Sequence, residues 1–479
     1  MIRSFSLSAL LVAVVFCVGC AVGPNYKRPS VDVPVTYRGP VPDTTAADPQ
    51  TSTTNSSSQA TVASLGDEKW WQVFQDKELQ ALIRAALKNN YDVRVAASRV
   101  LQAQAQLGIT RADQYPNLNV GGQINSLQSP VIGPFPSYEV TQGQVTGSAA
   151  WNLDFWGKYR RATEAARANL LASQWAQKEV IATLVANVAT DYFLLRQLDL
   201  ELEIARRTLD SRQDSLKLTK TLEEHGINSM LDVRQSEQLV YTAAAEVPDL
   251  QKQIGQTENA ISTLLGKNPE DIPRGMKLTE QPHLPQVPAG LPSELLTRRP
   301  DVRQAEETLV AANAQIGVAR AAYFPQVSLT GSAGYQSPAL TSLFTGPAGL
   351  WNLTAGVTQP IFEGGRLKSN VRLAEAEKQQ MLLTYQQTIQ GAFRDVSDAL
   401  IAYQKNREFR EQQQQLFASA QDAARLSEVR FKAGTTDYLE VLTNETNSFS
   451  AELGLAQAQG NELIALVQLY QALGGGWQE

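Results

Sequence analysis

One segment of this sequence occurs twice. Residues 92–116 and 301–325 are identical at eleven of twenty-five positions when aligned at an offset of 209. Later stretches align at almost the same offset, with Phe155 on Phe362 at 207 and Gly226 on Gly434 at 208. A register kept over so long a stretch indicates a duplicated structural unit. We therefore expect two copies of one fold, with an internal pseudo-symmetry.

Each copy has the same order of predicted elements. A first helix, over about 77–114 and 293–322, ends before Pro116 and Pro325, because the proline ring prevents helical continuation. Two strands with alternating apolar and polar residues follow, and then a long helix, a tight turn and a return helix. The expected bounds are 70–265 for the first copy, with hairpin 116–155, long helix 158–223 and return helix 229–265; and 293–473 for the second, with hairpin 325–362, long helix 366–432 and return helix 436–473.

The turns between the long and return helices have clear local signals. Gly226 and Gly434 suit the left-handed position that follows a helix C-terminus. Two pairs with the capping-box spacing then begin the return helices: Ser229 with Asp232, and Asp437 with Glu440. At about 1.5 Å per residue, each long helix is expected to measure on the order of 100 Å, which favours coiled-coil packing.

The remaining segments are predicted to be targeting or connecting regions. Residues 1–19 have the basic and apolar pattern of a signal peptide. They precede Cys20 in a sequence that resembles a lipoprotein cleavage box, so we expect Cys20 to carry lipid. The lipid-anchored extension covers 20–69, with a flexible low-complexity strap over 39–66. An equatorial linker is expected at 266–292 and a loose tail at 474–479.

The strands constrain the function most. Apart from the signal, no apolar run reaches the about 18 residues of a transmembrane helix, but tilted strands of about ten alternating residues cross outer membranes. Lipid leaves no sheet edge unpaired, and four strands are fewer than the ~8 of the smallest membrane barrel. Two chains would supply that minimum, and three would supply twelve strands and a wider lumen. A soluble sandwich capped by helices is the alternative.

Composition excludes several other classes of function. The net charge is −6 and no basic block is present, so nucleic-acid binding has no electrostatic support. With two histidines and two cysteines in the chain, we expect no metal site and no cofactor. No catalytic triad or phosphate-binding loop is found, so we do not expect an enzyme.

Four stretches, residues 22–29, 70–96, 291–325 and 431–442, resemble the outer membrane factor family of TolC-like channels, and in particular its NodT-type efflux lipoproteins. The resemblance implies an α+β, mainly α, fold. It further implies a homotrimer with a twelve-stranded outer-membrane β-barrel, a long periplasmic α-helical barrel and a mixed equatorial domain.

The resemblance also assigns roles at the two hairpin turns. Arg430, Phe431 and Gly434 match the family's tip motif, and with Gly226 they are expected to dock a periplasmic adaptor protein. The family constricts its pore with a ring of leucine and acidic residues. The corresponding gate candidates are Leu439 and Glu440, with Leu231 and Asp232 in the first copy. Both acidic residues also stand at positions where they could cap the return helices. Two interpretations are therefore open: helix capping alone, or helix capping together with gating.

We therefore predict an outer-membrane, lipid-anchored exit duct of a tripartite efflux system, extending into the periplasm. It would conduct drugs, toxic compounds or metal ions delivered by an adaptor and an inner-membrane pump of the resistance-nodulation-division class. Two alternatives are a duct for type I protein secretion, and a periplasmic coiled-coil lipoprotein without a pore.

Overall fold

The computed structural model describes residues 21–34, 36–38, 64–130, 133–134, 136–282, 287 and 290–478. The chain divides into two compact units. We call them the strand unit, with described residues within 21–30, 99–174 and 304–386, and the hairpin unit, with those within 31–98, 175–303 and 387–478.

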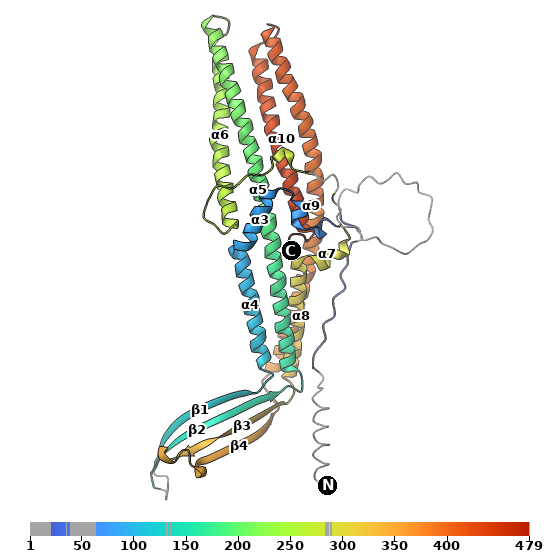
Figure 1. Ribbon diagram of the computed structural model, residues 1–479. Coiled ribbons are helices and arrows are strands. Elements are labelled where there is room, and N and C mark those ends of the chain that lie inside the picture. The colour runs from blue at the N-terminus through green and yellow to red at the C-terminus, as the bar shows by residue number, and fades with distance from the viewer. Residues whose placement is uncertain are drawn as a thin grey trace, which may run out of the picture. The chain divides into compact units, whose positions relative to one another are not determined.

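The strand unit contains one antiparallel sheet of four strands in the order β1-β2-β3-β4 (Figure 1). The strands are β1 (Asn117–Ser129), β2 (Tyr138–Leu153), β3 (Gln326–Ser337) and β4 (Gly349–Thr358). Leu118 lies opposite Ala149, and Trp151 lies opposite Leu329, so apolar side chains share one face along most of the sheet. Consecutive strands pair as neighbours, and β1 and β4 form the two edges.

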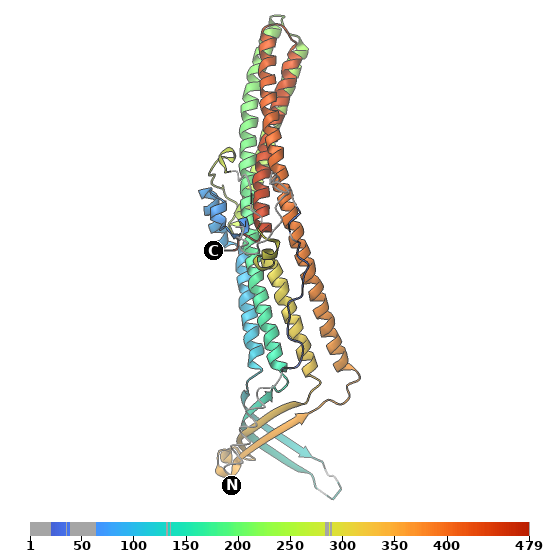
Figure 2. The same cartoon turned by 90° about the vertical axis from the view of Figure 1, so that its right-hand side faces the viewer.

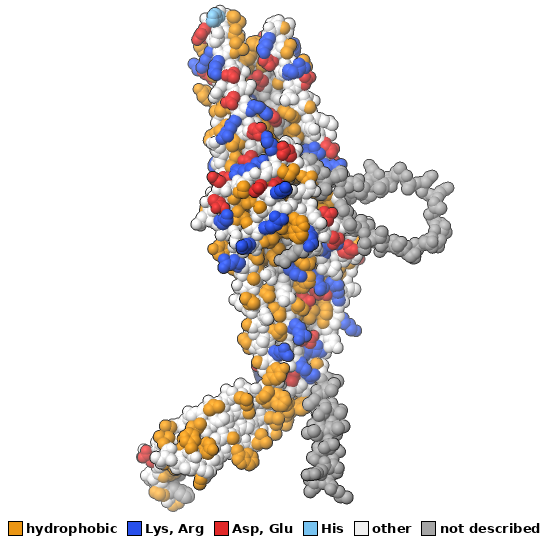
Figure 3. Space-filling view, in the orientation of Figure 1, with side chains coloured by type: hydrophobic (Ala, Val, Ile, Leu, Met, Phe, Trp, Pro, Cys, Tyr) orange, Lys and Arg blue, Asp and Glu red, His pale blue; other side chains and the backbone are white. Residues whose placement is uncertain are grey.

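The other face of the sheet carries neutral polar side chains. Gln123 on β1 donates to Gln144 on β2 at 2.8 Å, and Gln336 on β3 donates to Gln142 on β2 at 2.5 Å. Glu139 is the only charged residue within the four strands. Figure 3 shows the same contrast, since the visible sheet surface lacks the blue atoms that are frequent over the helices.

Four helices enter the strand unit: α4 (Tyr91–Ala112), α5 (Lys158–Glu224), α8 (Pro300–Ala321) and α9 (Arg366–Lys432). Ala165 and Ala168 of α5 pack on Ala311 and Ala314 of α8 in a buried alanine cluster. Small side chains allow the two backbones to approach closely, which explains the abundance of alanine in these helices. Among the described residues, no helix has an apolar stretch long enough to cross a membrane.

Two tryptophans fix the passage between helix and strand. The indole Nε1 of Trp156 donates to the carbonyl oxygen of Pro325 at 2.8 Å, and its ring stacks on Phe324 with centroids 4.8 Å apart. Trp151 Nε1 donates to the carbonyl oxygen of Gln114 at 3.0 Å. The chain just before β1 is therefore attached to β2 through Trp151. The chain just before β3 is attached through Trp156, which follows β2.

Residues 21–28 lie along the helices of the strand unit. Asn25 Oδ1 accepts a hydrogen bond from Arg161 at 2.7 Å, and Arg28 forms an ion pair with Glu306 at 3.0 Å. Glu306 is 7% exposed, so this pair is largely shielded from water. The chain is thus held in place directly after the position of Cys20, which itself lies outside the described residues.

The hairpin unit contains two helical hairpins of equal dimensions, which Figures 1 and 2 show as paired long helices. The helices α5 and α9 have 67 residues each, and α6 (Met230–Leu264) and α10 (Tyr438–Ala472) have 35 residues each. Both pairs begin 208 residues apart, whereas β1 and β3 begin 209 apart. The second copy is therefore one residue shorter in its sheet hairpin. The alignment of Phe155 with Phe362 at 207 is wrong by one position.

Each expected first helix is in fact two helices. The segment 77–114 contains α3 (Lys77–Asn89) and α4, because the side chain of Asn90 caps a new helix by accepting from the backbone N–H of Asp92 at 2.8 Å. In the second copy, α7 (Pro292–Arg298) ends before Pro300, where α8 begins. Proline disfavours a helical conformation of the residue before it and has no N–H to donate, so the proline itself explains the break between α7 and α8.

Within the hairpin unit, a buried carboxylate joins the start of α3 to α5 and to the linker between the repeats. Asp76 is 1% exposed and caps α3 by accepting from Glu78 N at 2.9 Å. It also accepts from the Tyr192 hydroxyl at 2.7 Å and from Met276 N at 2.9 Å. Short elements complete this region and the strand loop: η1 (Leu65–Asp67), α2 (Trp70–Val73), η2 (Leu278–Glu280), η3 (Leu340–Ser342) and η4 (Gly346–Ala348).

Two segments expected to be loose are packed where the structure describes them. The strap over 39–66 lies outside the described residues up to position 63, and residues 64–66 are buried. Residues 474–476 of the tail are also buried. The ring of Trp477 packs edge-on against Trp175 with centroids 5.8 Å apart, and the Lys178 ammonium lies 4.4 Å from the Trp477 centroid. These aromatic contacts are what the prediction of a loose tail missed.

Candidate functional site at the hairpin turns

The two turns have the same backbone geometry. Gly226 and Gly434 adopt left-handed φ angles of 72° and 69°, which confirms the predicted helix-ending glycines. In the first turn, Ile227 N donates to Leu222 O at 2.9 Å, and in the second turn Thr435 N donates to Arg430 O at 3.0 Å. Both are Schellman closures, which satisfy carbonyl groups at the helix end. The repeat thus extends to individual hydrogen bonds.

The predicted capping box is confirmed at the first turn. Ser229 Oγ accepts from Asp232 N at 3.3 Å, and Asp232 Oδ2 accepts from Ser229 N at 2.8 Å. The carboxylate is half-buried, whereas the neighbouring Leu231 side chain is 65% exposed. Capping therefore occupies one oxygen of Asp232.

The predicted capping box is wrong at the second turn. Asp437 is the N-cap residue, but its side chain accepts no capping hydrogen bond. Glu440 turns instead to Arg430, with 2.6 Å between Nη1 and Oε1, and it accepts a hydrogen bond from Thr436. A longer side chain with an arginine in reach favours the ion pair over the cap. Leu439 beside it is 59% exposed.

The two acidic gate candidates, Asp232 and Glu440, therefore differ in their electrostatic surroundings. The carboxylate of Glu440 has a cationic partner in Arg430, a contribution of about 0.2–1 kcal/mol for an exposed pair. The carboxylate of Asp232 accepts hydrogen bonds from the backbone N–H and the hydroxyl of Ser229, which are both neutral groups. Of the two acidic residues, Asp232 thus contributes more uncompensated negative charge to its turn.

A tyrosine that the sequence did not single out connects the two hairpins. The Tyr438 hydroxyl accepts from Ser236 Oγ of α6 at 2.9 Å and from Thr219 Oγ1 of α5 at 3.3 Å. All three side chains are buried. The Tyr438 ring also contacts Phe431, with centroids 5.1 Å apart, and Leu239 of α6 packs against the same cluster. The tip-motif residue Phe431 is thus part of the inter-hairpin contact.

A buried arginine adds a second connection. Arg212 of α5 is 4% exposed, donates to the carbonyl oxygen of Leu239 at 2.9 Å and lies over the Phe449 ring of α10 at 4.8 Å. Burial lowers the pKa of Arg212 and raises the pKa of Glu445 on α10, while the attraction between the two groups opposes both shifts. A buried charge held in this way is costly to expose without its partners.

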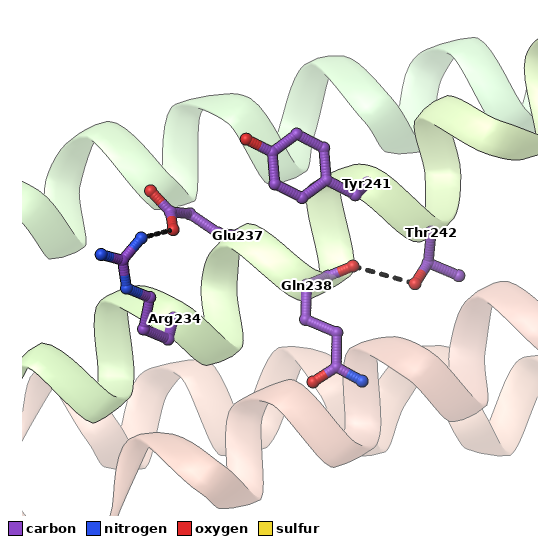
Figure 4. Close-up of a pocket in the computed structure, with 5 residues that line it drawn as sticks. All are labelled: Arg234, Glu237, Gln238, Tyr241 and Thr242. Carbon is purple, nitrogen blue, oxygen red and sulfur yellow. Dashed lines mark hydrogen bonds and ion pairs between the residues drawn. The ribbon is translucent and has the colours of Figure 1, made fainter.

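An open groove follows α6 near the first turn (Figure 4). It is lined by Arg234, Glu237, Gln238, Tyr241 and Thr242. Arg234 donates to Glu237 at 2.7 Å, and Lys220 of α5 lies 3.2 Å from the same carboxylate. These two cations lower the pKa of Glu237. The groove therefore presents ordered charges beside an exposed aromatic ring, which suits contact with another protein.

The described residues contain no group of three or more metal-ligating side chains. The charged segment at 298–301 has the local ion pairs expected of a helix start, with Arg299 on Asp301 at 2.7 Å and Arg298 on Glu294 at 3.0 Å. His225 lies exposed at the first turn, with its ring Nδ1 at 2.7 Å from the carbonyl oxygen of Thr221. None of these positions forms a catalytic arrangement.

A four-stranded sheet with one apolar and one neutral polar face, joined to paired long helices, is the architecture of an outer-membrane efflux channel subunit. The chain matches the outer membrane efflux protein family over residues 82–267 and 291–475, and it belongs to that family. The two matched segments correspond to the two repeats.

Characterised relatives and solved structures agree with this assignment. The chain is 36% identical to the toluene efflux pump outer membrane protein TtgC of Pseudomonas putida, over 99% of this chain and 96% of that protein. It is 34% identical to the cation efflux system protein CusC of Escherichia coli, over 96% and 98%.

A crystal structure of CusC superimposes with a TM-score of 0.84 at 32% identity, covering 95% of this chain and all of that one. The open-state channel MtrE of Neisseria gonorrhoeae superimposes with a TM-score of 0.83 at 31% identity, covering 96% and 99%. The predicted family and TolC-like channel fold are therefore confirmed. The protein is an exit duct of a tripartite efflux system in the outer membrane, and it is not an enzyme.

The inter-hairpin contact makes a first prediction. Replacing Tyr438 with Phe removes two hydrogen bonds at a site that excludes water, each worth about 1 kcal/mol. The two bonds together contribute about 2 kcal/mol, so amide exchange at the two turns should become faster by about thirtyfold. The matched control is Tyr241→Phe, which removes an exposed hydroxyl from α6. Equal exchange in Tyr438→Phe and the wild type would contradict the role given to Tyr438.

Proposed function

We propose that this chain works as a homotrimer whose twelve strands form one closed barrel, with an adaptor protein and a resistance-nodulation-division pump as its partners. The observation that supports this most is the sheet itself. Its apolar face suits lipid, its neutral polar face suits water, and neither edge is paired with another strand among the described residues. Three copies remove every edge and leave a polar lumen.

The hairpin turns are proposed as the gate of this duct. Leu231 and Leu439 are exposed large apolar side chains, suited to a narrow ring in a closed pore. Asp232 and Glu440 follow them in sequence and would add three carboxylates per ring. Because Arg430 pairs with Glu440, we propose that Asp232 has the larger effect on ion selectivity.

The same turns are proposed as the adaptor-docking surface. Gly226 and Gly434 lie at the tightest part of each hairpin, and a Cβ atom added at either glycine would meet no other atom within 4 Å, so a partner has direct access. Arg430 and the groove on α6 supply charge, while Phe431 supports the turn from inside. The adaptor would therefore recognise charged groups on exposed turns.

Cys20 is proposed as the lipid attachment site. Ala21 is the next residue, and it lies close to Gly157. A Cβ atom added at Gly157 would be 2.8 Å from the Cα atom of Ala21. Val22 N donates to Trp156 O at 3.0 Å. The chain thus emerges beside the end of β2, at a level suited to the inner surface of the bilayer. Mass spectrometry should find an acylated Cys20 as the first residue, and a free thiol there would contradict the proposal.

Small toxic compounds are proposed as the cargo. Relatives of similar identity have names that refer to toluene, antibiotic or cation efflux, so similarity alone does not select one of them. A deletion strain should become more susceptible to at least one of toluene, an antibiotic panel and a panel of metal-cation salts. The wild-type gene should restore resistance. Unchanged susceptibility to all of these, with a secreted protein lost instead, would favour the secretion alternative.

Ion conductance across a planar bilayer tests the gate. Asp232→Asn keeps a capping oxygen and removes the charge, so it should lower the cation-to-anion permeability ratio by at least about fivefold. One charge about 8 Å from an ion in water contributes about 0.5 kcal/mol, with opposite sign for cations and anions, and three such charges act in each ring. Glu440→Gln should have a smaller effect, because Arg430 already offsets that charge. Equal ratios in the wild type and both variants would leave these residues as structural groups only.

A further inference from the structure

One end of the β1–β2 hairpin extends beyond the rest of the sheet (Figure 2). β2 begins at Tyr138 but pairs with β3 only from Gly143, which lies opposite Ser337. Residues 125–129 of β1 and 138–142 of β2 form five further pairs, and no third strand among the described residues lies beside them. We call this two-stranded segment the hairpin end. At about 3.4 Å per residue, it is roughly 17 Å long.

The apolar face of the sheet becomes polar at the hairpin end. Ile124 is the last residue of β1 in the apolar alternation, and the next pair on its face is Ser126 with Thr141. The hydroxyl oxygens of this pair lie 2.9 Å apart. The following pair on the same face is Gln128 with Glu139. Hydroxyl, amide and carboxylate groups favour water over lipid, so the hairpin end lies outside the hydrocarbon of the bilayer.

An aromatic pair marks the same level on β3. The ring of Tyr335 contacts the ring of Phe344 with centroids 5.6 Å apart, and Phe344 is 71% exposed. Tyr335 lies opposite Val145 of β2, two residues inside the last β2–β3 pair. Aromatic side chains concentrate where a bilayer meets water. The edge of the bilayer therefore lies near this aromatic pair, and the hairpin end stands in the external medium.

The polar face changes in the opposite direction. Amide side chains continue along this face as far as Gln142, but the next pair outward is Leu127 with Val140, and Tyr138 follows. Leu127 and Tyr138 are 60% and 55% exposed. The face that suits water in the rest of the sheet thus ends in an apolar patch. We call Leu127, Val140 and Tyr138 the mouth patch.

The internal repeat shows that the fold does not require an apolar residue at this position. β1 begins at Asn117 and β3 at Gln326, 209 positions later, so Leu127 corresponds to Gln336. Gln336 lies opposite Gln144 on the same polar face. A glutamine is therefore accommodated at the equivalent position of the second copy. The leucine of the first copy indicates instead that something apolar covers it.

The same patch on two other copies of this chain is within reach. Twelve strands about 4.8 Å apart and tilted by about 40° enclose a ring with a radius of about 12 Å. The hairpin end is longer than this radius, and a ribbon of two strands twists more strongly than a wider sheet. Because the polar face lines the lumen of the proposed ring, the three mouth patches point towards one axis. Contact between them removes their apolar surface from water.

From these observations we infer that Leu127, Val140 and Tyr138 of three chains form an apolar constriction at the outer mouth of the duct. A narrow ring of apolar side chains resists water and ions, and it favours the passage of apolar compounds. This inference rests on the proposed trimer and adds to it a second constriction, distinct from the proposed gate at the hairpin turns.

Cysteine cross-linking between identical positions tests this constriction. Equivalent residues on a three-fold ring with a radius of about 12 Å lie about 21 Å apart, whereas a disulfide needs Cα atoms within about 7 Å. If the hairpin ends meet, mild oxidation of outer membranes should shift Leu127→Cys from monomer to dimer mass on a denaturing gel. Oxidation should also lower the ion conductance of this variant in a planar bilayer, and a reductant should restore it.

Two matched controls differ from Leu127→Cys in one respect each. Gln128→Cys is the neighbouring residue on the opposite face, and Gln336→Cys is the counterpart on the same face, where β2 and β3 pair. Both controls and the wild type should stay monomeric on the gel.

Three other results would contradict the inference. No dimer from Leu127→Cys, in protein that keeps the trimer mass in detergent, would overturn the constriction and leave the proposed trimer intact. Equal amounts of dimer in all three variants would indicate collisions between separate channels, and it would overturn the constriction too. No dimer together with a monomer mass in detergent would count against the proposed trimer as well.

Discussion

Backbone hydrogen bonding at the edges of the sheet is the constraint on which the rest of the structure depends. β1 and β4 each present one unpaired row of N–H and C=O groups, and lipid offers no substitute partner. A sheet of four strands can therefore be stable in lipid only when other chains pair with both of its edges. The alternation of apolar and neutral polar side chains follows from the same requirement, because one face meets lipid and the other meets water.

The length and close packing of the helices are explained by the need to continue the ring outside the bilayer. Helices α5 and α9 have 67 residues each, or about 100 Å. Alanine at positions such as Ala165 of α5 and Ala314 of α8 lets neighbouring helices pack closely, as a tube of helices requires. At their far ends the chain turns back at Gly226 and Gly434, where Tyr438, Thr219 and Ser236 hold the two hairpins together. Any widening of the turns must break or rearrange these contacts.

Sequence reasoning reached the repeat, the strand hairpins and the turn glycines because each depends on local chemistry: periodicity, proline and the left-handed glycine. It failed where distant groups compete. Glu440 has capping spacing, yet Arg430 takes its carboxylate. Trp477 directly follows three glycines, yet it packs on Trp175. Tyr438 gave no signal, because its partners Thr219 and Ser236 belong to the other repeat.

The central claim is that this chain closes its sheet by forming a trimer. The most direct test is the molecular mass of the detergent-extracted protein, with the detergent contribution subtracted. The expected result is three times the mass of the mature chain, whose full sequence, with the leader included, weighs 52.3 kDa. A monomer that keeps its native secondary structure would leave β1 and β4 unpaired, and it would contradict the account in favour of a periplasmic tether without a pore.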